Sequence, residues 1–318
     1  MARYLFRRIA QILPVVLALV IFNFILVRVA PGDPATALAG DNAPLEYIEA
    51  LRASYGLNEP IWMQLLIYLQ KLLQGDLGFS FAYRTPVLDV LLSRLYPTLL
   101  LVGVSQLVAI PLGILLGAIA ARYRNSALDT FISSSMLALY SIPVFWLGLV
   151  FILFFAVQLQ WLPSSGMMSF SYGRPPDPFD IARHLILPLS VLVLHTLPTY
   201  ARITRESVIE AAQDDSITTA RAIGYSEQVV FRRFALRNAL LPVTTVAGLS
   251  LSSLFAGALL VETVFAWPGM GRLMYDAVTQ RDFPVLMGGF LFTSIMVIVG
   301  SLVTDIIYVY LDPRVVYK

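Results

Sequence analysis

The run LLLVGVSQLVAIPLGILLGAIAA at residues 99–121 contains no charged side chain and decides the fold class of the chain. A bilayer core about 30 Å thick is crossed by about 20 consecutive apolar residues in a helix. The chain of 318 residues is 58% hydrophobic and 13% charged, with a mean hydropathy of +0.76, whereas soluble domains carry about 25% charged residues. We therefore predict an all-α, polytopic membrane protein.

Six such runs predict six transmembrane helices, at residues 9–27, 99–121, 131–157, 185–200, 243–261 and 285–308. Gly113 and Gly117 in the second run have the small-xxx-small spacing that favours close packing of helices. The fourth run is the weakest because it is short and contains Pro188, His195 and Pro198. The first follows Arg7 and Arg8 and has features of a signal peptide, but it is longer than the apolar core of about 7–15 residues that such peptides have. We expect an uncleaved transmembrane helix within residues 1–30.

Arginine and lysine near the helix ends predict the orientation, because cytoplasmic loops carry an excess of both. Counting them places both termini inside and the loop 201–242 in the cytoplasm. Residues 31–97 then form a long periplasmic excursion with helices expected at 45–54 and between Pro60 and Gly75. That excursion either caps the bundle or docks something outside. Residues 98–311 form the core permease domain, and residues 312–318 form a cytoplasmic tail.

Several functions are disfavoured by what the sequence lacks. It has no G-x-x-x-x-G-K-[ST] motif for binding nucleotide phosphates, no G-x-S-x-G motif, no cysteine, and only two histidines. We predict no catalytic residue, no metal site and no cofactor. The net charge of +2 is too small to suggest nucleic acid. An ion-coupled secondary transporter remains an alternative, although Asp305 and His195 are too few to form a convincing relay of intramembrane polar groups.

A polar island, DSITTARAIG at residues 215–224, separates two apolar runs on the cytoplasmic side. Asp215 is expected to cap the N-terminus of a two-turn helix, and Gly224 to follow its C-terminus. Arg221 then lies in the last turn, where a positive charge suits the helix dipole. Because isolated helices this short are marginal in water, the island packs either on its own bundle or on a separate cytoplasmic protein.

These and other motifs carry a resemblance over nearly the whole chain. The island and the later RNALLP at residues 237–242 resemble the coupling-helix motif of ATP-binding-cassette importer permeases. More closely, the chain resembles the first permease subunit of the dipeptide/oligopeptide/nickel group. Further matches are the ETVFAWPGMGR at residues 262–272, the RDFP at 281–284 and the closing Asp305, Tyr308, Asp312, Pro313 and Arg314. Ser216 and Ile223 depart from the usual Tyr and Lys.

The resemblance implies a type I importer transmembrane domain in a bacterial or archaeal plasma membrane, without catalytic activity of its own. It implies a heterodimer with a second homologous permease, two cytoplasmic ATPases and an extracytoplasmic substrate-binding protein. The implied substrate is a di- or oligopeptide; a nickel complex, glutathione or an opine is the alternative. The change at Ile223 removes a cation from the docking face, which puts exchange of ATPases between relatives in doubt.

The resemblance and the residues together give the candidate sites. The ATPase-coupling residues are Asp215, Thr219, Ala220, Arg221, Ala222 and Gly224, supported by Arg237, Asn238 and Pro242. The candidates for the outer gate of the pathway are Glu262, Trp267, Pro268, Gly269, Gly271, Arg272 and Asp282. Glu262 is expected either to line the pathway mouth or to be solvated, and Asp305 is an intramembrane polar candidate.

Overall fold

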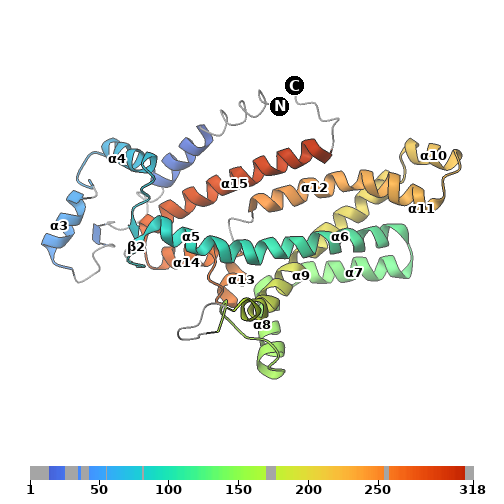
Figure 1. The fold of residues 1–318 in the computed structure, drawn as a ribbon, viewed down its shortest axis with the longest axis horizontal. Helices are drawn as coiled ribbons and strands as arrows, with labels where there is room; N and C mark the ends of the chain where they lie inside the picture. Colours follow the sequence, from blue (N-terminus) through green and yellow to red (C-terminus); the bar gives the residue numbers. More distant parts are fainter. Residues whose placement is uncertain are drawn as a thin grey trace.

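The computed structural model describes residues 14–25, 35–36, 43–54, 56–80, 82–169, 177–253 and 258–311. These residues are mostly helical, so the all-α class is confirmed (Figure 1). After the helix Pro14–Ile25 the elements, in chain order, are α3 (Leu45–Ser54), α4 (Ile61–Leu73), β1 (Phe79–Ser80), β2 (Thr85–Pro86), α5 (Val87–Thr98), η1 (Leu99–Gly103), α6 (Val104–Arg122), α7 (Ala127–Ser141), α8 (Val144–Phe151), η2 (Ile152–Gln158), α9 (Pro178–Ala211), α10 (Asp215–Ala222), α11 (Glu227–Val229), η3 (Val230–Ala235), α12 (Leu236–Ser253), α13 (Leu259–Val264), α14 (Met270–Thr279) and α15 (Phe283–Leu311).

Three described helices are long and apolar enough to cross a membrane: Val87–Arg122, Pro178–Ala211 and Phe283–Leu302. The pair Ala127–Ser141 and Val144–Gln158 makes a fourth if its two arms count as one span. These helices correspond to the second, fourth, sixth and third predicted runs. The first and fifth runs are described only in part, by the helix Pro14–Ile25 and by α12 with α13.

The second predicted run belongs to a longer helix made of α5, η1 and α6. Pro97 lies near the end of α5 and has no backbone N–H to donate, and the π-helical segment Leu99–Gly103 follows it directly. Such π-helical turns accommodate a local break in the α-helical hydrogen-bond ladder. The boundary that we drew between residues 97 and 98 therefore lies inside a helix.

The third predicted run is not a straight span, because its two arms meet at an angle of 95°. Ile142 is extended, with φ −80° and ψ 125°, and Pro143 begins the second arm. The residue before a proline avoids the α conformation, and the proline itself cannot donate to the preceding turn. The sequence Ser141-Ile142-Pro143 thus explains the bend.

The most extensive helix contact among the described residues is that of α6 with α9, which cross in the view of Figure 1. A Cβ atom on Gly113 would lie 2.4 Å from Cβ of Tyr200, and one on Gly117 would lie 2.3 Å from the carbonyl oxygen of Ala201. Only glycine permits this approach, so the tight packing expected from Gly113 and Gly117 is confirmed. The approach also places Tyr200 so that its hydroxyl donates to Gln106 at 2.8 Å.

The segment after the first helix contains both predicted helices, α3 and α4. Figure 1 shows them beyond one end of the long helices, and Tyr68 of α4 stacks on Phe24 of the helix Pro14–Ile25 with ring centroids 5.9 Å apart. Trp62 and Leu73 of α4 are exposed. An external docking role for α4 stays a prediction.

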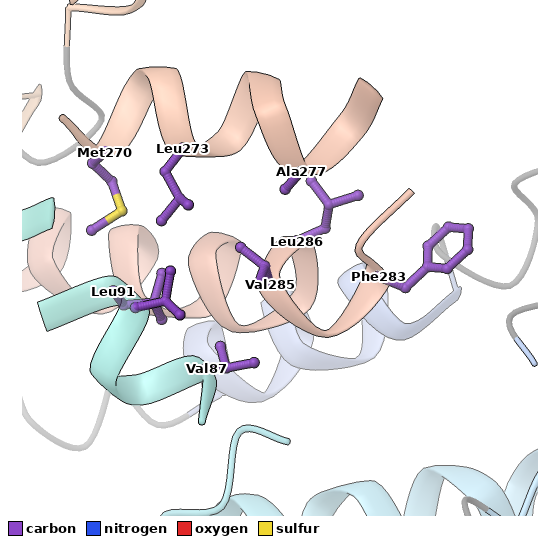
Figure 2. Close-up of a cluster of buried hydrophobic side chains, with 9 residues drawn as sticks. Val87, Leu91, Met270, Leu273, Ala277, Phe283, Val285 and Leu286 are labelled. Carbon is purple, nitrogen blue, oxygen red and sulfur yellow. The ribbon is translucent and has the colours of Figure 1, made fainter. Parts of the chain in front are cut away.

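The later part of the segment does join the bundle. Side chains of α5, α14 and α15 converge on a buried apolar cluster, drawn in Figure 2, that includes Leu91, Leu273 and Val285. The hairpin β1–β2 is fixed to the same cluster, because the Ser80 hydroxyl donates to Asp282 Oδ2 at 2.5 Å. Asp282 also accepts from the N–H of Val285 at the start of α15. Asp282 therefore serves as a buried structural tie in this arrangement.

Candidate coupling site

The polar island forms α10 and extends from the end of the long helix α9 (Figure 1). Its N-cap is Asp214, whose carboxylate accepts from the N–H of Ser216 at 2.8 Å, so our assignment of the cap to Asp215 was wrong by one residue. Asp215 is instead the first helical residue, where a carboxylate still favours the positive end of the dipole. The hydrogen bonds from Ser216 lower the pKa of the Asp214 carboxyl.

The C-terminus of α10 ends as predicted. Gly224 has φ +94°, a left-handed conformation that side chains other than glycine rarely adopt. The N–H of Gly224 donates to the carbonyl of Arg221, and the N–H of Tyr225 donates to that of Ala220. This pair of bonds is the Schellman motif, and it makes α10 a short helix with both ends closed.

One face of α10 packs on its own chain. Ile217 and Ala220 are buried in a small cluster with Val230 and Ala235 of the η3 region, beside Phe234. Ala220, assigned from the motif as a coupling residue, therefore faces inward and supports the helix. The first of our two alternatives for the island, packing on its own bundle, holds for this face.

The other face of α10 is exposed. It consists of Asp215, Ser216, Thr218, Thr219, Arg221 and Ala222, and it continues into Ile223 beyond the helix. Ile223 is 71% exposed, which is a large apolar area at the tip of a polar loop. The face combines hydroxyl groups, small side chains and one apolar tip, which is chemistry suited to a protein contact.

Arg221 forms an ion pair within its own chain. Its guanidinium forms two hydrogen bonds to Glu227 of α11, at 2.8 and 3.2 Å, and these lower the pKa of the Glu227 carboxyl. Both side chains are well exposed, so the pair is worth little stability by itself. Its geometric effect is to fix α10 against α11. Arg221 and Glu227 are six residues apart and lie on either side of a turn. Ion pairs within a helix are spaced by three or four residues, so the sequence did not predict this pair.

The loop between α10 and α12 is also tied to the end of α6. The guanidinium of Arg122 lies over the rings of Tyr123 and Phe231, 5.9 and 5.6 Å from their centroids. Further along, Arg237, Asn238 and Pro242 lie on exposed positions of α12, while Ala239 and Val243 between and after them are buried. The loop from α10 to α12 is therefore braced against the helices that it joins.

The outer-gate candidates form a second arrangement, centred on Glu262. Its carboxylate is fully buried and accepts from the Thr98 hydroxyl at 3.1 Å and from the N–H groups of Arg272 at 2.9 Å and Ala258 at 3.3 Å. A solvated Glu262 is therefore excluded. Thr98 in turn accepts from the N–H of Met270 at 2.7 Å. One carboxylate thus joins α5, α13 and α14.

The packing around Glu262 explains why glycine occupies positions 269 and 271 and why Trp267 is buried. A Cβ atom on Gly269 would lie 2.2 Å from the Glu262 carboxylate, and one on Gly271 would lie 2.9 Å from the backbone of Leu259. Trp267 is fully buried and donates from Nε1 to the carbonyl of Pro97 at 2.9 Å. Pro268 and Arg272 are partly exposed. A pathway role for these residues stays a prediction.

Asp305 lies in the last part of α15, where the side chains are outside the described residues. The closing motif at residues 312–314 is also outside them. Among the residues that the structure describes, no group of three or more His, Cys, Asp or Glu side chains could hold a metal ion.

The described helices include several that are long and apolar enough to cross a membrane, and the comparisons identify the family of the chain. Residues 113–317 match the family "Binding-protein-dependent transport system inner membrane component", and residues 1–102 match its N-terminal family, "Binding-prot-dependent transport system membrane comp, N-term". The chain belongs to the family of binding-protein-dependent ABC importer permeases, and it is a multi-pass inner-membrane protein.

Several proteins that are similar to this chain over its full length are named as permeases for peptides or glutathione. The chain is 37% identical over 318 residues to the oligopeptide transport system permease protein AppB of Bacillus subtilis, with 100% of both chains covered. It is 38% identical to the di/tripeptide transport system permease protein DppB of Pseudomonas aeruginosa, with 99% of both covered. It is 37% identical to the glutathione transport system permease protein GsiC of Escherichia coli, again with 100% of both covered.

A solved structure supports the fold. A chain of the methionine ABC transporter MetNI in an inward-facing conformation superposes with a TM-score of 0.57 and 20% identity, covering 70% of this chain and 96% of the other. At that identity the likeness establishes the architecture of the bundle and not its substrate.

Proposed function

We propose that this chain is one of two permease subunits of an ATP-driven importer and that α10 couples it to a cytoplasmic ATPase. The observation that carries the proposal is the division of α10 into a face buried on its own chain and a face left exposed. Two ATPases would hydrolyse ATP, a second homologous permease would complete the pathway, and a binding protein would deliver substrate outside. This chain would contribute six transmembrane helices with both termini inside.

The way α10 is held explains how it would transmit a movement. Both of its ends are capped, its inner face is packed on η3, and Arg221 fixes it to α11. A helix of this length would not hold its shape alone in water. Because it follows α9 and precedes α12, a push on its exposed face displaces both membrane helices together. The residues 262–272 and Asp282 would then hold the outer end of the pathway fixed.

We propose di- and oligopeptides as the substrates, because the relatives assigned to oligopeptides, di/tripeptides and glutathione are similar to this chain over its full length. Glutathione is itself a tripeptide, so all three share amide groups and charged termini. A nickel complex or an opine is the alternative. Isothermal titration of the partner binding protein with each class decides between them.

Ile223→Glu is expected to reduce substrate-stimulated ATP hydrolysis in the assembled complex to the unstimulated rate. The substitution places a charge on the 71% exposed apolar tip without touching the buried face of α10. Gln228→Glu on exposed α11 adds the same charge nearby and serves as the matched control. Undiminished stimulation in Ile223→Glu would contradict the coupling role.

The pair of Arg221 and Glu227 needs a separate design, because Arg221→Glu alone would break a bond within the loop. The double reversal Arg221→Glu/Glu227→Arg keeps the internal pair and inverts the charge at the docking face. Recovery of coupling in the double variant assigns Arg221 to bracing the loop, and continued loss assigns it to the partner contact.

A further inference from the structure

A polar stripe follows one face of α9 and is not used by the coupling site. His195, Thr199, Arg202 and Glu206 are spaced by four, three and four residues, which aligns them along one face of a helix. His195, Arg202 and Glu206 are exposed and Thr199 is partly exposed. The opposite face, with Tyr200 and Ala201, is buried against α6. From His195 to Glu206 the stripe extends about 16 Å along the helix.

Two cavities adjoin this stripe and share part of their lining. One, of about 480 Å³, is lined by Tyr140, His195, Thr196, Thr199, Tyr200 and Ser250 from α7, α9 and α12. The other, of about 370 Å³, also contains Tyr140 and Thr199 in its lining and extends along α7 and α9 to Arg202, Arg205 and Glu206. Because Tyr140 and Thr199 line both, the two cavities adjoin each other, and together they form a hollow along α9 that reaches Arg202, Arg205 and Glu206.

The polar groups in this hollow are unusual for a surface that faces lipid. The Tyr140 hydroxyl, the His195 ring and the Thr199 hydroxyl have no hydrogen-bond partner among the described residues. Ser190 and Thr196 on the same helix instead donate to their own helix, to the carbonyls of Ile186 at 2.7 Å and Leu192 at 2.9 Å. An unpaired polar group in hydrocarbon costs several kcal/mol, so the three unpaired groups require water or a polar partner.

We infer that this stripe lines the inner half of the transport pathway and hydrogen-bonds the main-chain amides of a passing peptide. The inference rests on the proposed function. Hydroxyl and imidazole groups both donate to carbonyl oxygens and accept from N–H groups, so they recognise any peptide backbone without selecting a side chain. At the loop end, Arg202 and Glu206 are 3.9 Å apart and largely exposed. That spacing is too long for a strong pair, so each charge can meet one terminus of the peptide.

The absence of cysteine from the chain allows a direct test. Single variants Thr199→Cys, His195→Cys and Leu107→Cys are made in the complete complex, reconstituted so that the cytoplasmic side is accessible to a charged, membrane-impermeant methanethiosulfonate. Leu107 of α6 is 74% exposed in the chain but purely apolar, which makes it the matched control for a lipid-facing position. We expect the cysteines at 199 and 195 to react at least about tenfold faster than that at 107, since a charged reagent enters hydrocarbon poorly.

A saturating di- or tripeptide, delivered by the binding protein, should slow the reaction at position 199. Equal rates at 199, 195 and 107, or rates that peptide leaves unchanged, would overturn the inference. The same samples are checked for copurified ATPases and for substrate-stimulated hydrolysis. If the complex contains the ATPases and hydrolysis is stimulated but the stripe is unreactive, the inference is wrong and the proposed function stands. If no ATPase copurifies with the chain, the proposed function is wrong.

Transport kinetics give a second readout. Tyr140→Phe and Thr199→Val each remove one hydrogen-bonding group with little change in volume, and each should raise KM for peptide uptake about fivefold, from the typical worth of one hydrogen bond. Ser190→Ala removes a hydroxyl that is satisfied within its own helix and should change KM less than about twofold. Equal effects of the three substitutions would contradict the assignment.

Discussion

Glu262→Ala is expected to destabilise the protein by about 3 kcal/mol or more, because it leaves several buried donors without an acceptor. The carboxylate now accepts from Thr98, Arg272 and Ala258, and both Glu262 and Thr98 are fully buried. Each of these donors would remain shielded from water and would lose its hydrogen bond to the carboxylate. The measurement is the thermal unfolding midpoint of the purified complex, followed with the yield of folded chain.

Two further variants make this prediction specific. Glu262→Gln keeps one acceptor oxygen but turns an NH₂ group toward the remaining donors, so it should fall between the wild type and Glu262→Ala. Gly269→Ala should destabilise too, since its Cβ would lie 2.2 Å from the carboxylate. A Glu262→Ala protein with an unchanged unfolding midpoint would show that the carboxylate does not hold α5, α13 and α14 together.

Arg205→Ala is expected to cost about 3 kcal/mol of stability, the typical result of removing one partner from a buried ion pair. Arg205 on α9 donates from Nε and from its terminal nitrogen to both oxygens of Asp129 on α7, at 2.7 and 2.8 Å. The Asp129 side chain is only 5% exposed, so its charge would stay buried and uncompensated. Thermal unfolding of the purified complex again provides the measurement.

The neighbouring Arg202 supplies the control for that substitution. Its side chain is 70% exposed and lies 3.9 Å from Glu206, so Arg202→Ala should change stability by less than about 0.5 kcal/mol. The double variant Arg205→Met/Asp129→Asn removes both charges and should recover part of the loss. Similar losses in Arg205→Ala and Arg202→Ala would contradict the special role of the buried pair.

The sequence was sufficient for the features that depend on local pattern. Apolar runs predicted membrane helices, Pro60 and Gly75 bounded α4, and Gly113 with Gly117 predicted close helix packing. The weakest predicted run lies within α9, a continuous helix of 34 residues, because prolines such as Pro188 and Pro198 are tolerated in membrane helices when neighbours satisfy the freed groups. A propensity argument therefore misjudged this segment.

Other features depend on residues far apart in the sequence. Thr98 reaches Glu262 across more than half the chain, and Arg205 reaches Asp129 from another helix. No spacing rule connects them. The assignment of the cap to Asp215 failed for a different reason: Asp214 beside it has the same side chain, and only the backbone conformation decides between them.

The most direct test of the central claim is a contact between α10 and an ATPase. A photo-crosslinking benzoylphenylalanine is placed at position 223, on the exposed tip, and for comparison at position 124, in the exposed turn between α6 and α7. On irradiation of the assembled complex, we expect an adduct between the residue at 223 and an ATPase subunit, and a much weaker one from 124. An intact complex that gives no ATPase adduct from position 223 would contradict the proposed coupling.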